Sequence, residues 1–440
     1  AGNITDPSLV NDPANNYRLP PGSLCLEAGS NQVWMTGAKD LDGNDRILNG
    51  TVDIGAYEFK PGALQCSFSG NVLKGMAPLA VVFTASVAGT NTAGANYQWD
   101  FENDSSVDVS GTDKGVVTNS YASAGIYSVK LLVTTAGESA SLTRSNYVTA
   151  CPVTAYVSPA GGNSPPYSSW ASAAQSIQAA VDMGTSGTTV WVTNGTYLIT
   201  SQISVVDGIV LQSVNGPTNT IVRRSAGTAR IFYLGHPTAV LDGFTVTNGN
   251  PGALAGGGVY CENGATVQNC IVSGNTSGGG GPAVGGGGVY LAAGTVSNCV
   301  ISGNAVAQHG AGGGVWLGSG GVVWNCLISR NNASDYAYGG GVYMSGGGLV
   351  AKCTISNNYH TTSGRGGGGI NMSGGMVSNC AIIANTGSGS AGSYTGGGVS
   401  MSGGLIHNCL IAGNSMSSGN GGGVAGASVQ GCTIANNTTD

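Results

Sequence analysis

Charged residues are scarce in this sequence. Only 8% of its 440 residues are Asp, Glu, Lys or Arg, against roughly 25% in typical soluble domains. The 14 basic residues are scattered and the net charge is −6, which argues against a nucleic-acid-binding surface. Because 41% of the residues are hydrophobic, the low charge does not indicate disorder. We therefore expect an ordered chain without a nucleic-acid partner.

Long apolar runs are also missing. No stretch approaches the roughly 18 uninterrupted apolar residues of a membrane-spanning helix. The first residues, AGNITDPSLV, lack the charged and apolar regions of a signal peptide. We expect a soluble chain with no membrane span, which is either a processed product or an excised piece.

Signatures of metal binding and catalysis are few. The four histidines are isolated, and neither H-x-x-x-H nor C-x-x-C occurs, so no zinc site is expected. The phosphate-loop motif and the calcium-binding nonapeptide are absent as well. Two acidic stretches are weak calcium candidates, and we expect no other cofactor. Their residues are Asp40, Asp42, Asn44 and Asp45, and Glu102, Asn103, Asp104 and Asp108.

What the chain has in abundance is glycine, 78 residues in all, arranged with a repeating motif such as NCVISGN at 298–304. Each unit also carries a glycine run followed by an aliphatic residue, as in GGGVYL at 286–291. The motif cysteines recur every 23 to 29 residues, and an Asn follows each by five positions. These residues are Cys270, Cys299, Cys326, Cys353, Cys380, Cys409 and Cys432, with Asn275, Asn304, Asn331, Asn358, Asn385, Asn414 and Asn437.

Two short alternating segments in a unit of about 27 residues predict strands separated by Gly, Ser and Asn turns. Such a unit is one coil of a parallel β-helix, an all-β fold. The Cys and the aliphatic residue two positions later then point inward. The Asn lies at a corner, in left-handed backbone geometry, with its amide bonded to the Asn above and below. We interpret the cysteines as small apolar core residues, because stacked thiolates would repel one another.

Residues 152–440 form the predicted β-helix domain. The stretch SWASAAQSIQAAVDM predicts a short amphipathic helix with a capping box from Ser172 to Gln175. Its apolar face would carry Ala173, Ile177, Ala180 and Val181. A solenoid must cover its exposed end, so we expect this helix to cap the first coil.

Residues 63–151 have fewer glycine runs and a late alternating segment, GIYSVKLLVTT, which predict a separate β-sandwich. The segment carries Trp99, Asp100 and Phe101, followed by Tyr121, Gly125, Tyr127 and Val129. This pattern resembles the polycystic-kidney-disease (PKD) type of immunoglobulin-like domain, although FEND replaces the family's FGDG turn. Cys66 and Cys151 bracket the segment, and we expect a disulfide or close apposition between them.

Residues 1–62 contain NITDP, YRL, a Gly-Ser stretch and DIGAYEF. This series resembles the closing coils of bacterial secreted pectin-lyase-like β-helix repeat proteins, in which it follows the N-C-x-I-x-x-N coils. The resemblance covers 1–60 and 152–440 and implies a right-handed β-helix. Here the closing segment comes first, so we expect it to complete the open C-terminal coil of a neighbour.

These patterns predict a non-catalytic, extracellular or cell-surface structural protein that assembles with itself, head to tail. The neighbour is either another subunit of a filament or the next period of a tandem array, and the alternative without self-association is a fragment of a larger surface protein. A carbohydrate-binding adhesin is the first alternative function, with glycans as partners. A polysaccharide lyase or hydrolase is the second, although paired acids are not evident in 161–440.

Overall fold

The computed structural model describes residues 19, 23–48, 50–59, 63–89, 92–278, 284–307, 309–334, 337–361, 366–388, 395–418, 420–426 and 428–439. The chain divides into two compact units, Ala1–Cys151 and Pro152–Asp440. The described part of 23–59 holds one short 3-10 helix, η2 (Val33–Met35), and two isolated bridges, Lys39 with Asp45 and Leu48 with Thr51. This part of the first unit is built mainly from turns.

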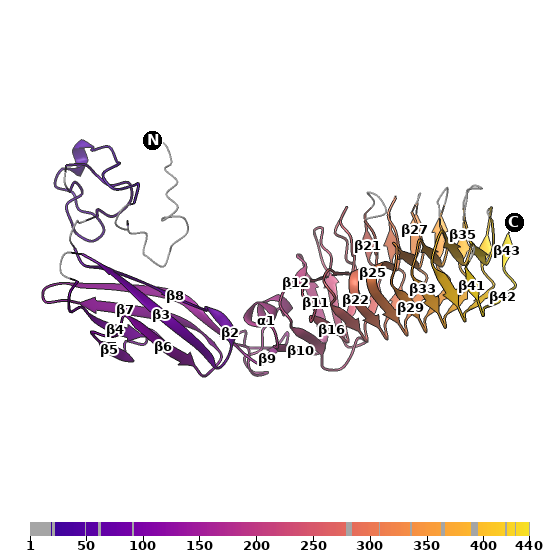
Figure 1. Cartoon of the computed structure of the whole chain (residues 1–440), viewed down its shortest axis with the longest axis horizontal. Helices are drawn as coiled ribbons and strands as arrows, with labels where there is room; N and C mark the ends of the chain where they lie inside the picture. Colours follow the sequence, from indigo (N-terminus) through magenta and orange to yellow (C-terminus); the bar gives the residue numbers. More distant parts are fainter. Residues whose placement is uncertain are drawn as a thin grey trace. The chain divides into compact units, whose positions relative to one another are not determined.

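The rest of the first unit is a two-sheet sandwich, as predicted (Figure 1). One sheet has the order β1 (Gln65–Gly70), β3 (Leu79–Ala88), β6 (Val116–Tyr121). The other has the order β2 (Lys74–Met76), β8 (Ser139–Cys151), β7 (Gly125–Thr134), β4 (Asn96–Asp100), β5 (Val109–Gly111). Its core is aromatic, with Phe83, Trp99 and Phe101 stacked between the sheets. The buried Trp99 donates its indole N–H to the Lys114 carbonyl at 2.9 Å, which satisfies its polar atom.

The second unit is a parallel β-helix, which confirms the predicted fold (Figure 1). One parallel sheet comprises β11 (Gly195–Ile199), β14 (Thr220–Arg224), β17 (Thr245–Thr247), β20 (Ile271–Ser273), β23 (Val300–Ser302), β26 (Leu327–Ser329), β30 (Thr354–Ser356), β34 (Ala381–Ile383), β38 (Leu410–Ala412) and β42 (Thr433–Ala435). A shorter sheet comprises β21 (Thr276–Ser277), β24 (Ala305–Val306), β27 (Asn332–Ser334), β31 (Tyr359–Thr361), β35 (Thr386–Gly387), β39 (Ser415–Met416) and β43 (Thr438–Thr439).

The remaining strands form two parallel rows that join through the long strands β22 (Val289–Ser297) and β25 (Val315–Trp324). One row adds β12 (Ile203–Val205), β15 (Phe232–Leu234), β18 (Val259–Cys261), β28 (Val342–Met344), β32 (Ile370–Met372), β36 (Val399–Met401) and β40 (Val424–Ala425). The other adds β9 (Thr154–Val157), β10 (Thr189–Val192), β13 (Val210–Ser213), β16 (Val240–Asp242), β19 (Thr266–Gln268), β29 (Leu349–Ala351), β33 (Met376–Ser378), β37 (Leu405–His407) and β41 (Val429–Gln430).

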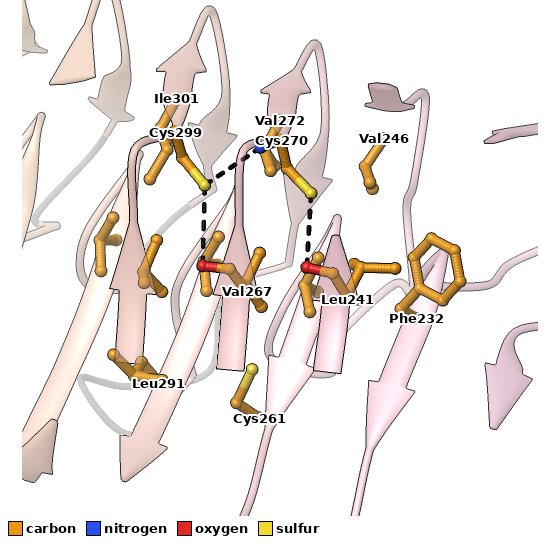
Figure 2. Close-up of a cluster of buried hydrophobic side chains, with 14 of the residues drawn as sticks. Phe232, Leu241, Val246, Cys261, Val267, Cys270, Val272, Leu291, Cys299 and Ile301 are labelled. Carbon is orange, nitrogen blue, oxygen red and sulfur yellow. Dashed lines mark hydrogen bonds between the residues drawn. The ribbon is translucent and has the colours of Figure 1, made fainter. Parts of the chain in front are cut away.

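The register places equivalent residues of successive coils side by side. Val259 pairs with Val289, which pairs with Val315, so the aliphatic residues after the glycine runs form one inward row. Cys270, Val272 and their equivalents face the same core (Figure 2). The period of about 27 residues therefore arises because each coil repeats the same three inward strand positions.

The capping helix exists but begins later than predicted. Helix α1 spans Ile177–Met183, and Ser176 is its N-cap, accepting a hydrogen bond from the Ala179 backbone N–H. The expected capping box is wrong, because Ser172 bonds instead to Ser169 and Gln175 reaches the carbonyl of Gly161. Its apolar face packs on β9, β10 and β12. The helix thus covers the first coils. Its start differs from the prediction because Ser172 lies close to Ser176, which is the N-cap.

Candidate functional sites: ladders, an acidic turn and a terminal coil

The left-handed corners of each coil lie one residue earlier than predicted. The ladder Asn residues themselves do not have positive φ; the preceding residue does, for example Gly274 at 63°. A second left-handed residue precedes each Cys, for example Asn269 at 54°. The two sets are Gly274, Gly303, Arg330, Asn357, Ala384, Gly413 and Asn436, and Asn269, Asn298, Asn325, Lys352, Asn379, Asn408 and Gly431. These two left-handed positions recur in each coil of the motif, and the ladder Asn between them and the next strand points inward.

The inward Asn residues form a continuous hydrogen-bonded ladder. Asn304 has about 1% of its surface exposed. Its Nδ2 donates to the Val272 carbonyl at 2.9 Å and to Asn331 Oδ1 at 3.0 Å, and its backbone N–H donates to the same Oδ1 at 3.0 Å. The same three bonds recur from Asn275 to Asn414. A buried amide is costly unless it is satisfied, and here every coil satisfies its neighbour's.

The motif cysteines form a second inward column. The Cys270 backbone N–H donates to Cys299 Sγ at 3.4 Å, and the two thiols contact the Leu241 and Val267 carbonyls of the preceding coils (Figure 2). Each thiol also lies against the carbonyl two residues before it. Burial raises the pKa of the neighbouring core thiol of Cys261 to about 12, and hydrogen bonding to Cys353, together with burial, raises the pKa of Cys380 to about 12. At neutral pH the thiols of Cys261 and Cys380 are therefore protonated, small and apolar.

An aromatic row that the sequence patterns above do not predict lies on the outer face. Tyr260 and Tyr290 stack with ring centroids 4.8 Å apart, and Tyr290 and Trp316 are 4.1 Å apart. Tyr233 and Tyr343 extend the row at its two ends. All five are partly exposed. The sequence contains the signal for four of them, since Tyr260, Tyr290, Trp316 and Tyr343 follow the Val of GVYC, GVYL, GVWL and GVYM; Tyr233 follows Phe232.

The aromatic row ends beside a pair of charged groups. The Arg230 guanidinium lies 4.7 Å from the Tyr260 ring centroid, and the Tyr233 hydroxyl donates to Glu262. Arg230 is buried, and desolvation lowers its pKa. The row therefore carries polar groups at one end as well as ring edges along its length.

An acidic turn in the sandwich brings together three possible metal ligands. One carboxylate oxygen from each of Asp100, Glu102 and Asp108 lies within 4.8 Å of the others. Burial and the nearby carboxylate of Asp108 raise the pKa of Glu102 to about 7. Asp100 also accepts the backbone N–H groups of Asp104 and Ser105. Carboxylate oxygens are the ligands that Ca²⁺ prefers; of the four sequence candidates in this turn, Glu102 and Asp108 belong to the group.

The other calcium candidate is organised differently. The Asp40 carboxylate accepts hydrogen bonds from the backbone N–H groups of Asp42, Asn44 and Glu58 and from the Asn44 amide. These bonds lower the pKa of Asp40 against the opposing effect of burial, which is individually the largest influence. Asp45 pairs with Lys39 at 2.6 Å. Backbone and side-chain donors of the protein thus occupy the Asp40 carboxylate, and its hydrogen bonds hold the loop together.

The expected proximity of Cys66 and Cys151 is wrong, and both are thiols. The Leu64 backbone N–H donates to Glu138, and the Gly70 N–H donates to Tyr147, so Cys66 lies beside the first half of β8. Cys151 ends that strand. At about 3.3 Å per residue the two are roughly 30 Å apart, whereas a disulfide needs Cα atoms within about 7 Å.

A buried histidine lies on the inner face of the short sheet. His360 on β31 is about 1% exposed, and both ring nitrogens lack a hydrogen-bond partner among the described residues. It stacks between Ala333 and Gly387 in the register of that sheet. Desolvation lowers its pKa to about 4. The imidazole is therefore neutral at physiological pH.

The last described coil exposes core positions. Ile434 pairs with Ile411 in register, but 52% of Ile434 is exposed and none of Ile411. Cys432 and Val429 are likewise only partly buried, while their equivalents Cys409 and Ile406 are buried. Strands at the end of a parallel stack also present unpaired backbone groups.

The comparisons with known proteins agree with this architecture. The PKD domain model matches residues 63–148, and the model of the right-handed beta helix region matches residues 257–439. No curated protein and no solved structure matches the chain. Among the described residues, no helix is long and apolar enough to cross a membrane. Right-handed β-helices occur in pectate-lyase-like enzymes and in non-enzymes, so the match assigns a fold and no reaction. The chain thus contains a PKD domain and a right-handed β-helix region, a combination that favours an extracellular or surface location.

Proposed function

We propose that the chain is a non-catalytic extracellular structural protein that associates head to tail. In this arrangement residues 1–62 of one copy cover the last coil of the next. The neighbour is a separate subunit of a filament or the following period of a tandem array, and the contact is the same in both.

The exposure of Ile434 is the observation that carries the proposal. Fully burying an Ile side chain stabilises a contact by about 1.5–3 kcal/mol, and every earlier member of its row from Val272 onward is already buried. The segment that would cover it exposes apolar side chains of its own. Leu24, Val33, Trp34 and Leu41 are 65–94% exposed. Two apolar surfaces on the same chain thus support a heterologous contact.

Sedimentation velocity and negative-stain microscopy of the purified chain test the proposal. We expect concentration-dependent association and filaments with a constant axial repeat. Ile434→Lys should abolish both, because it places a charge on the contact. Ile126→Lys is the matched control, since Ile126 is 44% exposed on the sandwich strand β7, and it should leave association intact. Monomers at every concentration, or equal loss in both variants, would contradict the proposal.

A second candidate function is glycan binding, and the aromatic row favours it. Partly exposed tyrosine and tryptophan edges continue over five coils beside Arg230 and Glu262. The ring faces are already stacked on one another, so binding would use hydroxyls and edges. A glycan array probed with wild-type chain and with Tyr290→Ala separates the two functions, since that variant should retain self-association.

A further inference from the structure

The aromatic row on the outer face is a continuous chain of rings with two defined ends. Strand pairing places each ring beside the next, and Ser204 and Asn371 occupy the same position in the coils before and after the row. The ring centroids of successive members lie 5.7, 4.8, 4.1 and 6.3 Å apart, within the range of aromatic contact. In chain order the members are Tyr233, Tyr260, Tyr290, Trp316 and Tyr343.

Four of the five rings are nearly parallel. From Tyr233 to Trp316 the successive interplanar angles are 15°, 1° and 10°, whereas Trp316 and Tyr343 are tilted by 42°. Overlapping parallel faces couple the π electrons of neighbouring rings, and indole and phenol are the aromatic side chains that lose one electron most readily. Electron transfer along the row is therefore favoured between Tyr233 and Trp316 and is weaker toward Tyr343.

The Tyr233 end of the row has a proton acceptor in place. The Tyr233 hydroxyl donates to the Glu262 carboxylate. This hydrogen bond, together with partial burial, raises the pKa of Tyr233, so the phenol keeps its proton at neutral pH. A phenol that has lost an electron becomes a strong acid, and a base within hydrogen-bond reach takes its proton directly. Tyr233 is therefore the member of the row at which an oxidised state is stabilised.

We propose that the row carries oxidising equivalents along the outer face of the β-helix from Trp316 to Tyr233. An external one-electron oxidant, a high-valent metal complex or a peroxide-derived radical, takes one electron from Trp316 and is reduced. An electron then passes from Tyr233 through the Tyr260 and Tyr290 rings to Trp316, while the phenolic proton moves to Glu262. The products are a restored indole, a neutral tyrosyl radical and a protonated carboxyl group.

A fixed positive charge keeps the oxidised state from settling within the row. The Arg230 guanidinium lies 4.7 Å from the Tyr260 ring centroid. Its charge disfavours a cation radical on that ring. A neutral tyrosyl radical at Tyr233 carries no positive charge and does not suffer this repulsion. Tyr260 thus couples its neighbours without holding the oxidised state.

The inner side of the same strands shows what the relay protects. Cys261 follows Tyr260 on β18 and Met344 follows Tyr343 on β28, and both sulfurs are fully buried in the core. Oxidation of a buried thiol or thioether makes it polar and disrupts the packing around it. A row that moves oxidising equivalents to a surface tyrosine keeps this chemistry on the outer face.

The test is flash photolysis of the full chain with photogenerated tris(bipyridine)ruthenium(III) as the oxidant, followed by spin trapping and mass-spectrometric mapping of the trapped radicals. We expect the tryptophan-radical absorption to decay as the tyrosyl absorption rises, with the adduct mainly on Tyr233. Tyr290→Leu interrupts the row and should lower the Tyr233 adduct several-fold relative to that on Trp316. Tyr359→Phe is the control, because Tyr359 is 41% exposed on β31 outside the row; it should leave both adducts unchanged.

Two further variants separate the relay from a structural role. Glu262→Gln removes the proton acceptor, so the tyrosyl absorption should rise several-fold more slowly and at a rate that depends on buffer concentration. Tyr233→Phe removes one hydroxyl and should leave the radical on Trp316, and it decides the outcome if Tyr290→Leu fails to fold. An unchanged Tyr233 adduct in Tyr290→Leu, a rate unaffected by Glu262→Gln, or radicals spread evenly over exposed aromatic residues would overturn the proposal.

Discussion

Asn304 Oδ1 accepts two hydrogen bonds from Asn275 of the preceding coil, one from the backbone N–H at 3.0 Å and one from Nδ2 at 2.9 Å. A single oxygen thus satisfies two buried donors. Because the next coil repeats the arrangement, each Asn protects the backbone of another coil as well as its own side chain. Removing one Asn therefore affects two coils.

The ladder gives the first prediction. Asn331→Ala should destabilise the β-helix by about 3 kcal/mol, since it leaves the Asn304 donors and the Ile301 carbonyl buried without a partner. The measurement is the urea midpoint of the β circular-dichroism signal. Asn325→Gly is the control, because Asn325 is exposed and left-handed at φ 51°; its midpoint should barely move. Equal shifts would show that burial of the ladder has no special role.

A matched pair of left-handed residues gives the second prediction. Ala384 at φ 54° and Gly413 at φ 62° occupy equivalent exposed positions in adjacent coils. A left-handed conformation costs a residue with Cβ about 1–2 kcal/mol. Ala384→Gly should therefore stabilise the protein by about 1 kcal/mol and Gly413→Ala should destabilise it similarly, as measured by thermal midpoints. A Cβ at Gly413 would meet no atom within 4 Å, so a clash cannot account for the loss.

His360 gives a pH prediction. Its pKa is lowered to about 4 by burial, below the unfolded value of about 6.5. The unfolded chain binds more protons between these values, so folding stability should fall as the pH drops from about 6.5 to about 4, by on the order of 3 kcal/mol. His360→Val, which copies Val306 of the same row, should flatten this dependence in urea denaturation. His407→Val, at an exposed site on β37, should leave it unchanged.

Glu102 predicts the opposite slope for the sandwich. Its pKa is raised from 4.5 to about 7 by burial and by Asp108. The folded domain then binds more protons between these values, so this contribution to stability is present below about pH 4.5 and is lost as the pH rises to about 7. Glu102→Gln should raise the thermal midpoint of the sandwich at pH 8 and have little effect at pH 4. Asp113→Asn, outside the turn, should give no gain at pH 8.

The β-helix could be predicted because its determinants are periodic. Cys270 and Val272 show the inward positions directly, since one coil follows another at a nearly constant interval. The same interval predicts the Asn ladder, but it does not predict which residue at the corner has the left-handed backbone conformation. Gly274, and not Asn275, has the left-handed conformation. The chain turns at Gly274, and this turn directs the Asn275 side chain into the core.

The other errors involve contacts that no interval encodes. Cys66 and Cys151 bracket a domain in sequence, yet the parallel course of β1 and β8 places them at different ends of the sandwich. The start of α1 was assigned from Ser172, whereas Ser176 satisfies the first turn. The cluster of Asp100, Glu102 and Asp108 depends on a turn in which the Asp108 carboxylate accepts the Phe101 backbone N–H. Tertiary geometry rather than local pattern decides each of these.

All amide groups of the Asn ladder point the same way along the axis, since Nδ2 of each Asn donates toward the Asn that follows in the chain. Their dipoles therefore add, and chains of aligned hydrogen bonds polarise one another. The column has a direction: Asn275 Oδ1 accepts from Gly249 on the side of the first coils, and each later Oδ1 accepts from the Asn before it, as far as Asn437. The two ends of the column therefore differ in polarity, and the buried ladder gives the β-helix a chemical direction along its axis.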